Sequence, residues 1–155
     1  MSVNCRQAAA ADLQSAAELI RDHPLFSPYG LTPARLLRSL EAALAQDDGV
    51  LVAAHHDEIL GLIWVQQQGA FGRSGYVRLL VTSSKAQGRG IGSSLLAAAE
   101  EMVFRHSADM FLLANSLNLA AITFYERLGY KQVGTIPDYV APGLTEEILH
   151  KKRPA

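Results

Sequence analysis

Cysteine is almost absent from the sequence, since Cys5 is the one such residue in 155. No disulfide can therefore form within the chain, and the cysteine content does not point to an oxidising compartment. An excess of charge is missing too, because 14 basic residues are balanced by 15 acidic ones and the formal net charge is −1. A near-neutral chain lacks the basic surface that is typical of nucleic-acid-binding proteins.

Long uninterrupted apolar runs are also lacking. None approaches the ~20 residues that are needed to cross a bilayer. The alanine-rich start of the chain is interrupted by Arg6, Asp12 and Glu18, which distinguishes it from a secretory signal peptide. The sequence therefore predicts a cytoplasmic protein with neither a membrane partner nor a nucleic-acid partner.

Apolar residues make up 49% of the chain and charged residues 19%, which fits a globular protein and argues against disorder. A chain of 155 residues is long enough to bury ~68–70% of its unfolded surface. Because no repeat, linker or low-complexity segment divides it, we expect one domain, residues 1–155.

Hydrophobic periodicity predicts alternating helices and strands. The expected helices cover residues 13–20, 33–44, 91–102 and 119–128. The expected strands cover residues 3–7, 76–81, 110–115, 131–136 and 145–152, and a hairpin lies within 49–68. This order predicts a mixed sheet with helices on both faces.

Cap and turn residues mark several boundaries. Asp12 is placed to begin the first helix, and Thr32 with Pro33 to begin the second. The segment DHPLFSPYGLTP contains three prolines and a glycine and predicts a loop. GAFGRSG is expected to break the chain before the strand YVRLLV. Gly129 suits the left-handed position after the last helix.

Three glycines lie in the segment QGRGIG, residues 87–92, directly before an apolar helix. The first N–H groups of a helix have no partner within it, and the helix dipole places partial positive charge there. Glycines remove the side chains that would keep an anion from these groups, so the segment suggests a pyrophosphate-binding site. The alternative, a turn combined with close helix packing, stays open.

The spacing of the glycines excludes two common phosphate-binding motifs. A P-loop requires a lysine after its second glycine, and no lysine follows here. The dinucleotide-binding pattern GxGxxG would place its third glycine at Ser93 or Leu95. What remains is Gln-x-x-Gly-x-Gly, formed by Gln87, Gly90 and Gly92.

This pattern, between an apolar strand and an Ala/Leu-rich helix, resembles motif A of the GNAT superfamily of N-acetyltransferases. The segment NSLNLAAITFYERLGYKQVG resembles the family's other signature, with Asn118, Ala121, Phe124, Tyr125, Leu128, Gly129 and Tyr130 at the matching positions. The two signatures and the order of elements extend the resemblance over nearly the whole chain. It implies the GNAT-like acyl-CoA N-acyltransferase fold, α/β (α+β), with one mostly antiparallel sheet of about six to seven strands. It also implies an acetyl-CoA-dependent N-acetyltransferase that uses no metal.

The resemblance implies that three groups of residues bind acetyl-CoA. Motif A would hold the pyrophosphate, the end of the strand YVRLLV would pair with the pantetheine amides, and the second signature would complete the site. A main-chain N–H near Val81 would polarise the thioester carbonyl. Between Val81 and Gln87 the chain has one residue more than the family pattern, so the loop TSSKA is expected to bulge. The expected contacts are Leu80, Val81, Thr82, Gln87, Gly88, Arg89, Gly90, Ile91, Gly92, Ser93, Asn118, Ala121 and Phe124.

Tyr125 holds the position at which the family carries a general acid, so the resemblance implies that its phenol protonates the departing thiolate. Tyr125 lies about 100° around the helix from Phe124, which shares a face with Ala121 and Leu128 and is expected in the core. Packing of Tyr125 against the cofactor without proton transfer, or its burial in the core, remain alternatives. Asn118 can either cap its helix or bond the cofactor.

No general base is evident, because the strand YVRLLV lacks the Glu that some family members carry there. The candidates are His23, His55, Asp138, Tyr139 and Glu146. A lysine-like amine is only about 0.1% neutral near neutral pH, whereas an α-amine is far closer to its reactive form. The missing base therefore slightly favours an α-amine as acceptor.

The acceptor is expected to be a primary amine of a small molecule, an amino-acid-like compound or a protein terminus. HPLFSPYGL and PDYVAPGL are expected to line its pocket, where Phe26, Tyr29 and Tyr139 could form an apolar mouth. Phe26 could equally anchor its loop to the core. Because Cys5 is remote from both motifs, direct transfer is favoured over ping-pong. A non-catalytic acyl-CoA-binding sensor or regulatory module, a purely structural domain, and a homodimer stay open.

Overall fold

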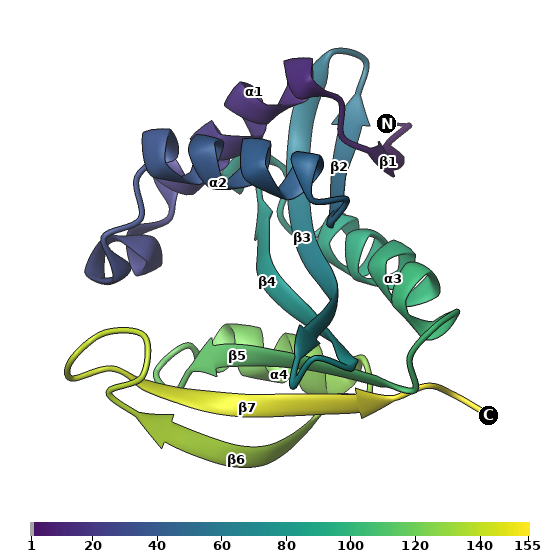
Figure 1. The fold of residues 1–155 in the computed structure, drawn as a ribbon. Helices are drawn as coiled ribbons and strands as arrows, with labels where there is room; N and C mark the ends of the chain where they lie inside the picture. The colour runs from purple at the N-terminus through teal and green to yellow at the C-terminus, as the bar shows by residue number, and fades with distance from the viewer. Residues whose placement is uncertain (1) are drawn as a thin grey trace.

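The computed structural model describes residues 2–155 and contains one seven-stranded sheet (Figure 1). The order across the sheet is β1-β2-β3-β4-β5-β7-β6, and among these strands only β4 and β5 pair in parallel. The strands are β1 (Asn4–Gln7), β2 (Gly49–His55), β3 (Glu58–Ala70), β4 (Ser74–Thr82), β5 (Asp109–Asn115), β6 (Lys131–Pro137) and β7 (Thr145–Lys152). The helices are α1 (Leu13–Glu18), α2 (Pro33–Ala45), α3 (Ile91–Phe104) and α4 (Leu119–Arg127). The predicted mixed sheet is confirmed.

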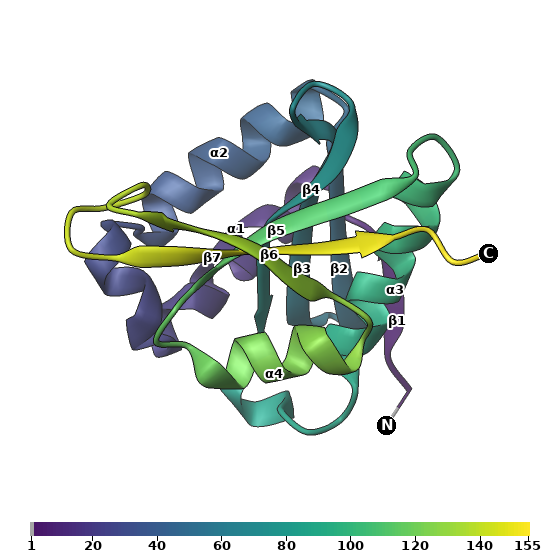
Figure 2. The same ribbon diagram turned by 90° about the horizontal axis from the view of Figure 1, so that it is seen from below.

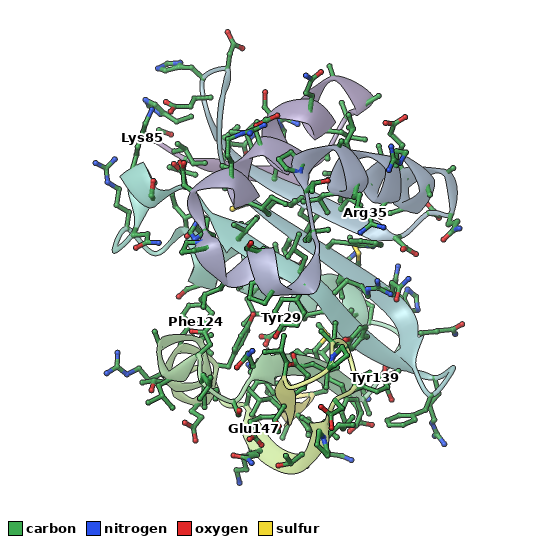
Figure 3. All side chains as sticks on the ribbon, turned by 90° about the vertical axis from the view of Figure 1, so that its left-hand side faces the viewer. Tyr29, Arg35, Lys85, Phe124, Tyr139 and Glu147 are labelled. Atoms are coloured by element: carbon green, nitrogen blue, oxygen red, sulfur yellow. The ribbon has the colours of Figure 1, made fainter. Side chains whose placement is uncertain are left out.

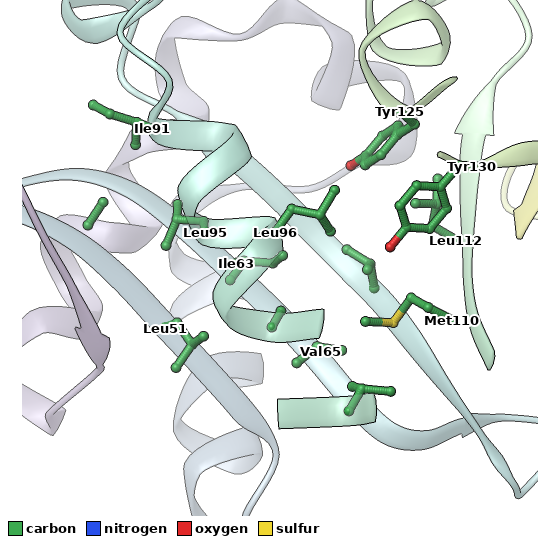
Figure 4. Close-up of a cluster of buried hydrophobic side chains, with 14 of the residues drawn as sticks. Leu51, Ile63, Val65, Ile91, Leu95, Leu96, Met110, Leu112, Tyr125 and Tyr130 are labelled. Atoms are coloured by element: carbon green, nitrogen blue, oxygen red, sulfur yellow. The ribbon is translucent and has the colours of Figure 1, made fainter. Parts of the chain in front are cut away.

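Helices cover both faces of the sheet because successive strand residues point to opposite sides. In β2, Val50 and Val52 pack in a buried cluster with α1 and α2, whereas Leu51 and Ala53 join a second cluster with α3. Figure 2 shows α2 and α4 on opposite sides of β5 and β7. Figure 4 shows the second cluster, in which Leu95 and Leu96 of α3 lie against the sheet.

The sheet is split between its two central strands. β4 and β5 are paired at three positions only, from Gly75↔Met110 to Val77↔Leu112. Beyond Val77 the strands diverge, so the last part of β4 has a strand on one side only (Figure 1). The divergence begins at a bulge at Arg78, where Leu79 pairs with Trp64 and Val77 with the next residue of β3. A bulge adds a residue to one strand, and this bends and twists that strand.

Four expectations from the sequence need correction. The expected loop 22–33 contains a 3-10 helix, Pro24–Tyr29, and the first helix is α-helical only to Glu18, with a 3-10 turn at Leu19–Asp22. The expected break GAFGRSG is shorter, because β3 extends to Ala70 and β4 begins at Ser74. Asp12 precedes α1, but its carboxylate bonds Arg6 and the N–H of Ala9 rather than capping the helix. No helix of residues 2–155 is long and apolar enough to cross a membrane.

A close approach of α3 to β3 fixes the start of that helix beside the end of β4. A Cβ built on Gly61 of β3 would lie 2.8 Å from Leu95 and 2.9 Å from Ile91, so only glycine fits there without movement. Gly61 is also paired with Thr82, the last residue of β4. The packing of α3 therefore sets the relative positions of the glycine segment and the strand end.

Leu95→Ala should lower the free energy of unfolding by ~2–5 kcal/mol, because Leu95 is 0% exposed and its loss leaves a cavity between α3 and the sheet. Urea unfolding followed by circular dichroism would measure the change. Leu117→Ala is the matched control: Leu117 is 83% exposed, so the same substitution should cost well under 1 kcal/mol. Equal losses in the two variants would contradict this account of the core.

Candidate active site

The glycine segment forms the turn that begins α3. Gly88 and Gly90 both have positive φ, 79° and 75°, and Gly90 is the residue immediately before the helix. The first bond of the helical pattern runs from the N–H of Ser94 to the carbonyl of Gly90, at 3.0 Å. Within residues 2–155, the N–H groups of Ile91, Gly92 and Ser93 donate no hydrogen bond. Three donors and the helix dipole thus converge on one point, as an anion requires.

The three glycines differ in what surrounds them. A Cβ on Gly88 or Gly90 would meet nothing within 4 Å, so these two face open space. A Cβ on Gly92 would lie 3.3 Å from the ring of Phe124 and 3.8 Å from the side chain of Thr82. Close packing, the alternative explanation, therefore applies to Gly92 and not to the other two. Gly92 brings the start of α3, the end of β4 and α4 together.

The end of β4 presents main-chain polar groups alternately to β3 and to the open side. The N–H of Ser83 bonds the carbonyl of Leu60 at 2.8 Å, which marks the Ser83–Leu60 pair as hydrogen-bonded. In an antiparallel pair of strands, every second residue directs its main-chain N–H and C=O to the partner strand. Val81, two residues before Ser83, therefore also bonds β3, while the main-chain groups of Leu80 and Thr82 point away from β3. The N–H groups available on the open side therefore belong to Leu80 and Thr82, rather than to Val81 as expected from the sequence.

His23 forms a hydrogen bond with one of the main-chain groups on the open side of β4, the carbonyl of Thr82. Its Nε2 lies 2.7 Å from the carbonyl oxygen of Thr82, so Nε2 carries the hydrogen. The ring also meets Phe26 edge-on at 6.3 Å, and Phe26 packs against the α1–α2 cluster. Phe26 therefore anchors its loop to the core.

The burial of Phe124 and Tyr125 is the reverse of what the helical pattern predicts. Tyr125 is the buried residue of α4, 8% exposed, and packs edge-on against Phe124 at 5.1 Å and Tyr130 at 5.6 Å. Phe124 is only half-buried and lies against Gly92. Figure 4 shows Tyr125 projecting into the cluster between α3 and the sheet. Burial raises the pKa of the Tyr125 phenol, so it stays protonated at neutral pH.

Of the remaining predicted contacts, some can offer a side chain to the site and others only their main chain. Gln87 is exposed, and Ile91 buries its side chain in the core, so Ile91 offers the site only its main chain. Asn118 caps α4, accepting a hydrogen bond from the N–H of Ala121 at 3.2 Å, which confirms its predicted capping role. The loop TSSKA, which the sequence predicts to bulge, contains a 3-10 turn at Ser84–Ala86.

The five candidate bases occupy very different places. His55 bonds the carbonyl of Ser2 at the β2–β3 hairpin, and Asp138 accepts the N–H of Gly143 in the β6–β7 turn. Tyr139 is 64% exposed. Glu146, in contrast, is 4% exposed and lies in β7 directly opposite Asn115 of β5.

Glu146 is joined to the α1–α2 connection by a chain of hydrogen bonds that the sequence did not predict. The Tyr29 hydroxyl donates to Glu146 Oε2 at 2.9 Å and accepts from Asn115 Nδ2 at 2.9 Å. Figure 3 shows Tyr29 between the two halves of the molecule, with Phe124 to one side and Tyr139 to the other. A separate cavity of about 440 Å³ between α1 and α2 contains none of the predicted site residues.

Comparison with solved structures establishes the fold class. An N-acetyltransferase from Staphylococcus aureus Mu50 gives a TM-score of 0.82 over 98% of this chain and 99% of that one, at 15% identity. PaiA N-acetyltransferase from Thermoplasma acidophilum, solved with coenzyme A, gives 0.78 over 99% and 100% at 19% identity. At these identities the likeness shows the fold alone, which is the GNAT acyl-CoA N-acyltransferase fold.

Sequence comparison then identifies the family. Residues 14–130 match the model of the acetyltransferase (GNAT) family, and the chain belongs to that family. It is 30% identical over 151 residues to mycothiol acetyltransferase of Mycolicibacterium vanbaalenii, covering 89% of this chain and 50% of that protein. It is 35% identical over 77 residues to blasticidin-S acetyltransferase of Streptomyces morookaense, covering 50% and 56%. The chain spans about half the length of these curated relatives.

Glu146→Gln should stabilise the fold at neutral pH and lose that advantage in acid. Burial, aided by the charge of Glu147 and opposed by the Tyr29 hydrogen bond, raises the pKa of Glu146 above its ordinary value of 4.5. Because the folded protein favours the protonated carboxyl, wild type is relatively more stable below about pH 4.5, where Glu146 is protonated in both the folded and unfolded states. This stability is lost as the pH rises through the folded-state pKa and the buried carboxyl ionises. The difference in urea midpoint between variant and wild type should therefore shrink from pH 7 towards pH 4.

The neighbouring carboxylate provides the control. Glu147 accepts hydrogen bonds from Gln132 and Thr135, so Glu147→Gln should give no such gain at neutral pH. A wild type that is more stable than Glu146→Gln at pH 7 would show that the carboxylate already has a compensating partner.

Proposed function

We propose that the protein is an acetyl-CoA-dependent N-acetyltransferase, formed by a single domain over residues 1–155, that transfers acetyl directly to a primary amine. The observation that carries this proposal is the split between β4 and β5 with the donor-rich start of α3 at its end. An extended ligand with an anionic end fits both features, because a strand edge accepts amide groups and a helix start accepts phosphates.

In this proposal each part of acetyl-CoA has its own residues around the split. The N–H groups of Ile91, Gly92 and Ser93 would hold the pyrophosphate, with Gly88 and Gly90 leaving room for it. The open-side groups of Leu80 and Thr82 would pair with the pantetheine arm, and Gln87, Arg89, Asn118, Ala121 and Phe124 would complete the site.

Acetyl-CoA supplies an acetyl thioester, and the chain supplies a proton donor and main-chain dipoles. The N–H groups of Leu80 and Thr82 are fixed by the β3–β4 register, so they can polarise a carbonyl without reorganising. Tyr125 holds its proton because its phenol is buried, and it would give that proton to the departing sulfur.

Direct transfer is supported by the position of Cys5. It lies in β1, the edge strand, which is separated from β4 by β2 and β3. Burial raises the pKa of its thiol, which disfavours the thiolate that a covalent acetyl-enzyme would need.

Gly90→Glu should abolish the thermal stabilisation that acetyl-CoA gives to the wild type, because the new side chain places negative charge and bulk where the pyrophosphate would lie. A thermal-shift titration would measure it. Gly72→Glu is the matched control: Gly72 also has positive φ, 68°, and open space around it, but it lies in the β3–β4 turn. Equal stabilisation of both variants by acetyl-CoA would refute the proposed pyrophosphate site.

Tyr125→Phe should lower kcat by ~10²–10⁴-fold while acetyl-CoA binding is retained, because the ring contacts stay and the proton donor is lost. Thiol release would be followed over amino acids, polyamines, aminoglycosides and short peptides. Unchanged turnover would leave Tyr125 a packing role only. Binding of acetyl-CoA without release over the whole panel would favour a non-catalytic sensor.

A further inference from the structure

Glu146 is a buried carboxylate without a cation. Its residue is 4% exposed, yet within residues 2–155 it takes part in no ion pair. Burying an ionised carboxylate is costly unless it is paired, and most buried charges have a partner of opposite sign. The one side-chain hydrogen bond that Glu146 accepts, from Tyr29, uses Oε2 and leaves Oε1 for another partner.

The hydrogen-bond chain that ends on Glu146 has a fixed direction. Asn115 Oδ1 accepts the N–H of Leu117 at 2.8 Å, so its amide must turn Nδ2 towards Tyr29. Since Asn115 donates to the Tyr29 oxygen, the Tyr29 hydrogen is directed at Glu146. The chain therefore holds the carboxylate in one orientation.

Glu146 and Tyr125 reach the split sheet from opposite faces. Met110 and Leu112 of β5 belong to the cluster that contains Tyr125, so the alternate residues, including Asn115, point to the other face. Glu146 shares that face because it is paired with Asn115. A ligand between β4 and β5 would thus have the proton donor on one side and the carboxylate on the other.

Aromatic rings accompany the carboxylate. Tyr29 bonds it directly. Tyr76 of β4 is a further ring of this region: burial raises the pKa of its phenol, the charge of Arg78 lowers it, and Tyr139 and Glu146 raise it by smaller amounts. A carboxylate among tyrosine rings is a suitable environment for a small organic cation, because the ring faces also attract positive charge.

We propose that Glu146 binds the ammonium group of the acceptor and accepts its proton, with Tyr29 and Asn115 as positioning residues. The acceptors are then aliphatic primary amines that are cationic at neutral pH. This inference rests on the proposed acetyltransferase function and supplies the base that the sequence did not reveal. The slight preference for a weakly basic α-amine no longer holds, because that preference came from the lack of a base.

Glu146 takes one proton from the ammonium, and the neutral amine nitrogen forms a bond to the acetyl carbon as the carbon–sulfur bond breaks. The sulfur leaves with the bonding electrons and takes the Tyr125 proton. The second proton lost from nitrogen restores the phenol through solvent, and Glu146 releases its own proton to solvent.

The test compares Glu146→Gln with Glu147→Gln in the full chain. Both remove one carboxylate from adjacent positions of β7, but Glu147 points to the opposite face. The probes are n-butylamine, alaninamide and spermidine as cationic acceptors, and aniline as a neutral one. Thiol release gives kcat and KM for each acceptor, and thermal shift gives acetyl-CoA binding.

Glu146→Gln should lower kcat/KM for the best cationic acceptor by ~10²–10⁴-fold, while acetyl-CoA binding and the Glu147→Gln variant stay near wild type. Any rate with aniline should fall far less. A wild type that binds acetyl-CoA but acetylates none of the cationic probes, or a Glu146→Gln variant with unchanged kcat/KM, overturns the inference. Failure of the wild type to bind acetyl-CoA would instead refute the proposed function.

Tyr29→Phe tests whether the Tyr29 hydroxyl positions Glu146 or whether the ring serves only in packing. It should raise KM for the cationic acceptor and leave acetyl-CoA binding intact, and its effect should largely disappear in the Glu146→Gln background. Equal effects of Tyr29→Phe in the two backgrounds would show that Tyr29 does not act through Glu146.

Discussion

The incomplete pairing of β4 and β5 is the constraint on which the site depends. Main-chain N–H and C=O groups are normally satisfied by a neighbouring strand, and a split leaves them without one. Here the pairing stops at Val77↔Leu112, directly before the bulge at Arg78. At the bulge, the guanidinium of Arg78 lies over the ring of Trp64, at 4.8 Å from its centre. The split therefore creates a polar strand edge inside the molecule, where a ligand can take the place of a strand.

The other parts of the site are arranged around this split by ordinary packing. Gly61 lets α3 approach β3 closely enough to place its donor-rich start at the end of β4. Gly92 lets Phe124 pack against that same turn, which brings α4 to the split. Both contacts need a residue without a side chain, so glycine here sets distances between elements. Gly88 and Gly90 have a different role, since they provide positive φ and open space.

The sequence predicted the features that depend on local spacing. The glycine turn, the order of helices and strands, the Asn118 cap and the cap at Thr32 follow from residues within one or two turns of each other. It did not show which main-chain groups of β4 face the split, because that depends on the register with β3. Helical periodicity also assigned Phe124 to the core. Periodicity shows which side chains of α4 share a face, but it does not show which face packs against the rest of the protein. Tyr29 and Glu146 are 117 residues apart, so no local pattern could join them.

His23 links the two sides of the split. It belongs to the connection that carries Tyr29 to Glu146, and its Nε2–H bonds the carbonyl of Thr82 on the strand edge. That carbonyl is one of the few open-side acceptors on β4, so a ligand that pairs with the edge must share it with His23 or displace the ring. The strand edge and the Glu146 carboxylate are thus contacted by one short segment, in which His23 directly precedes the 3-10 helix Pro24–Tyr29.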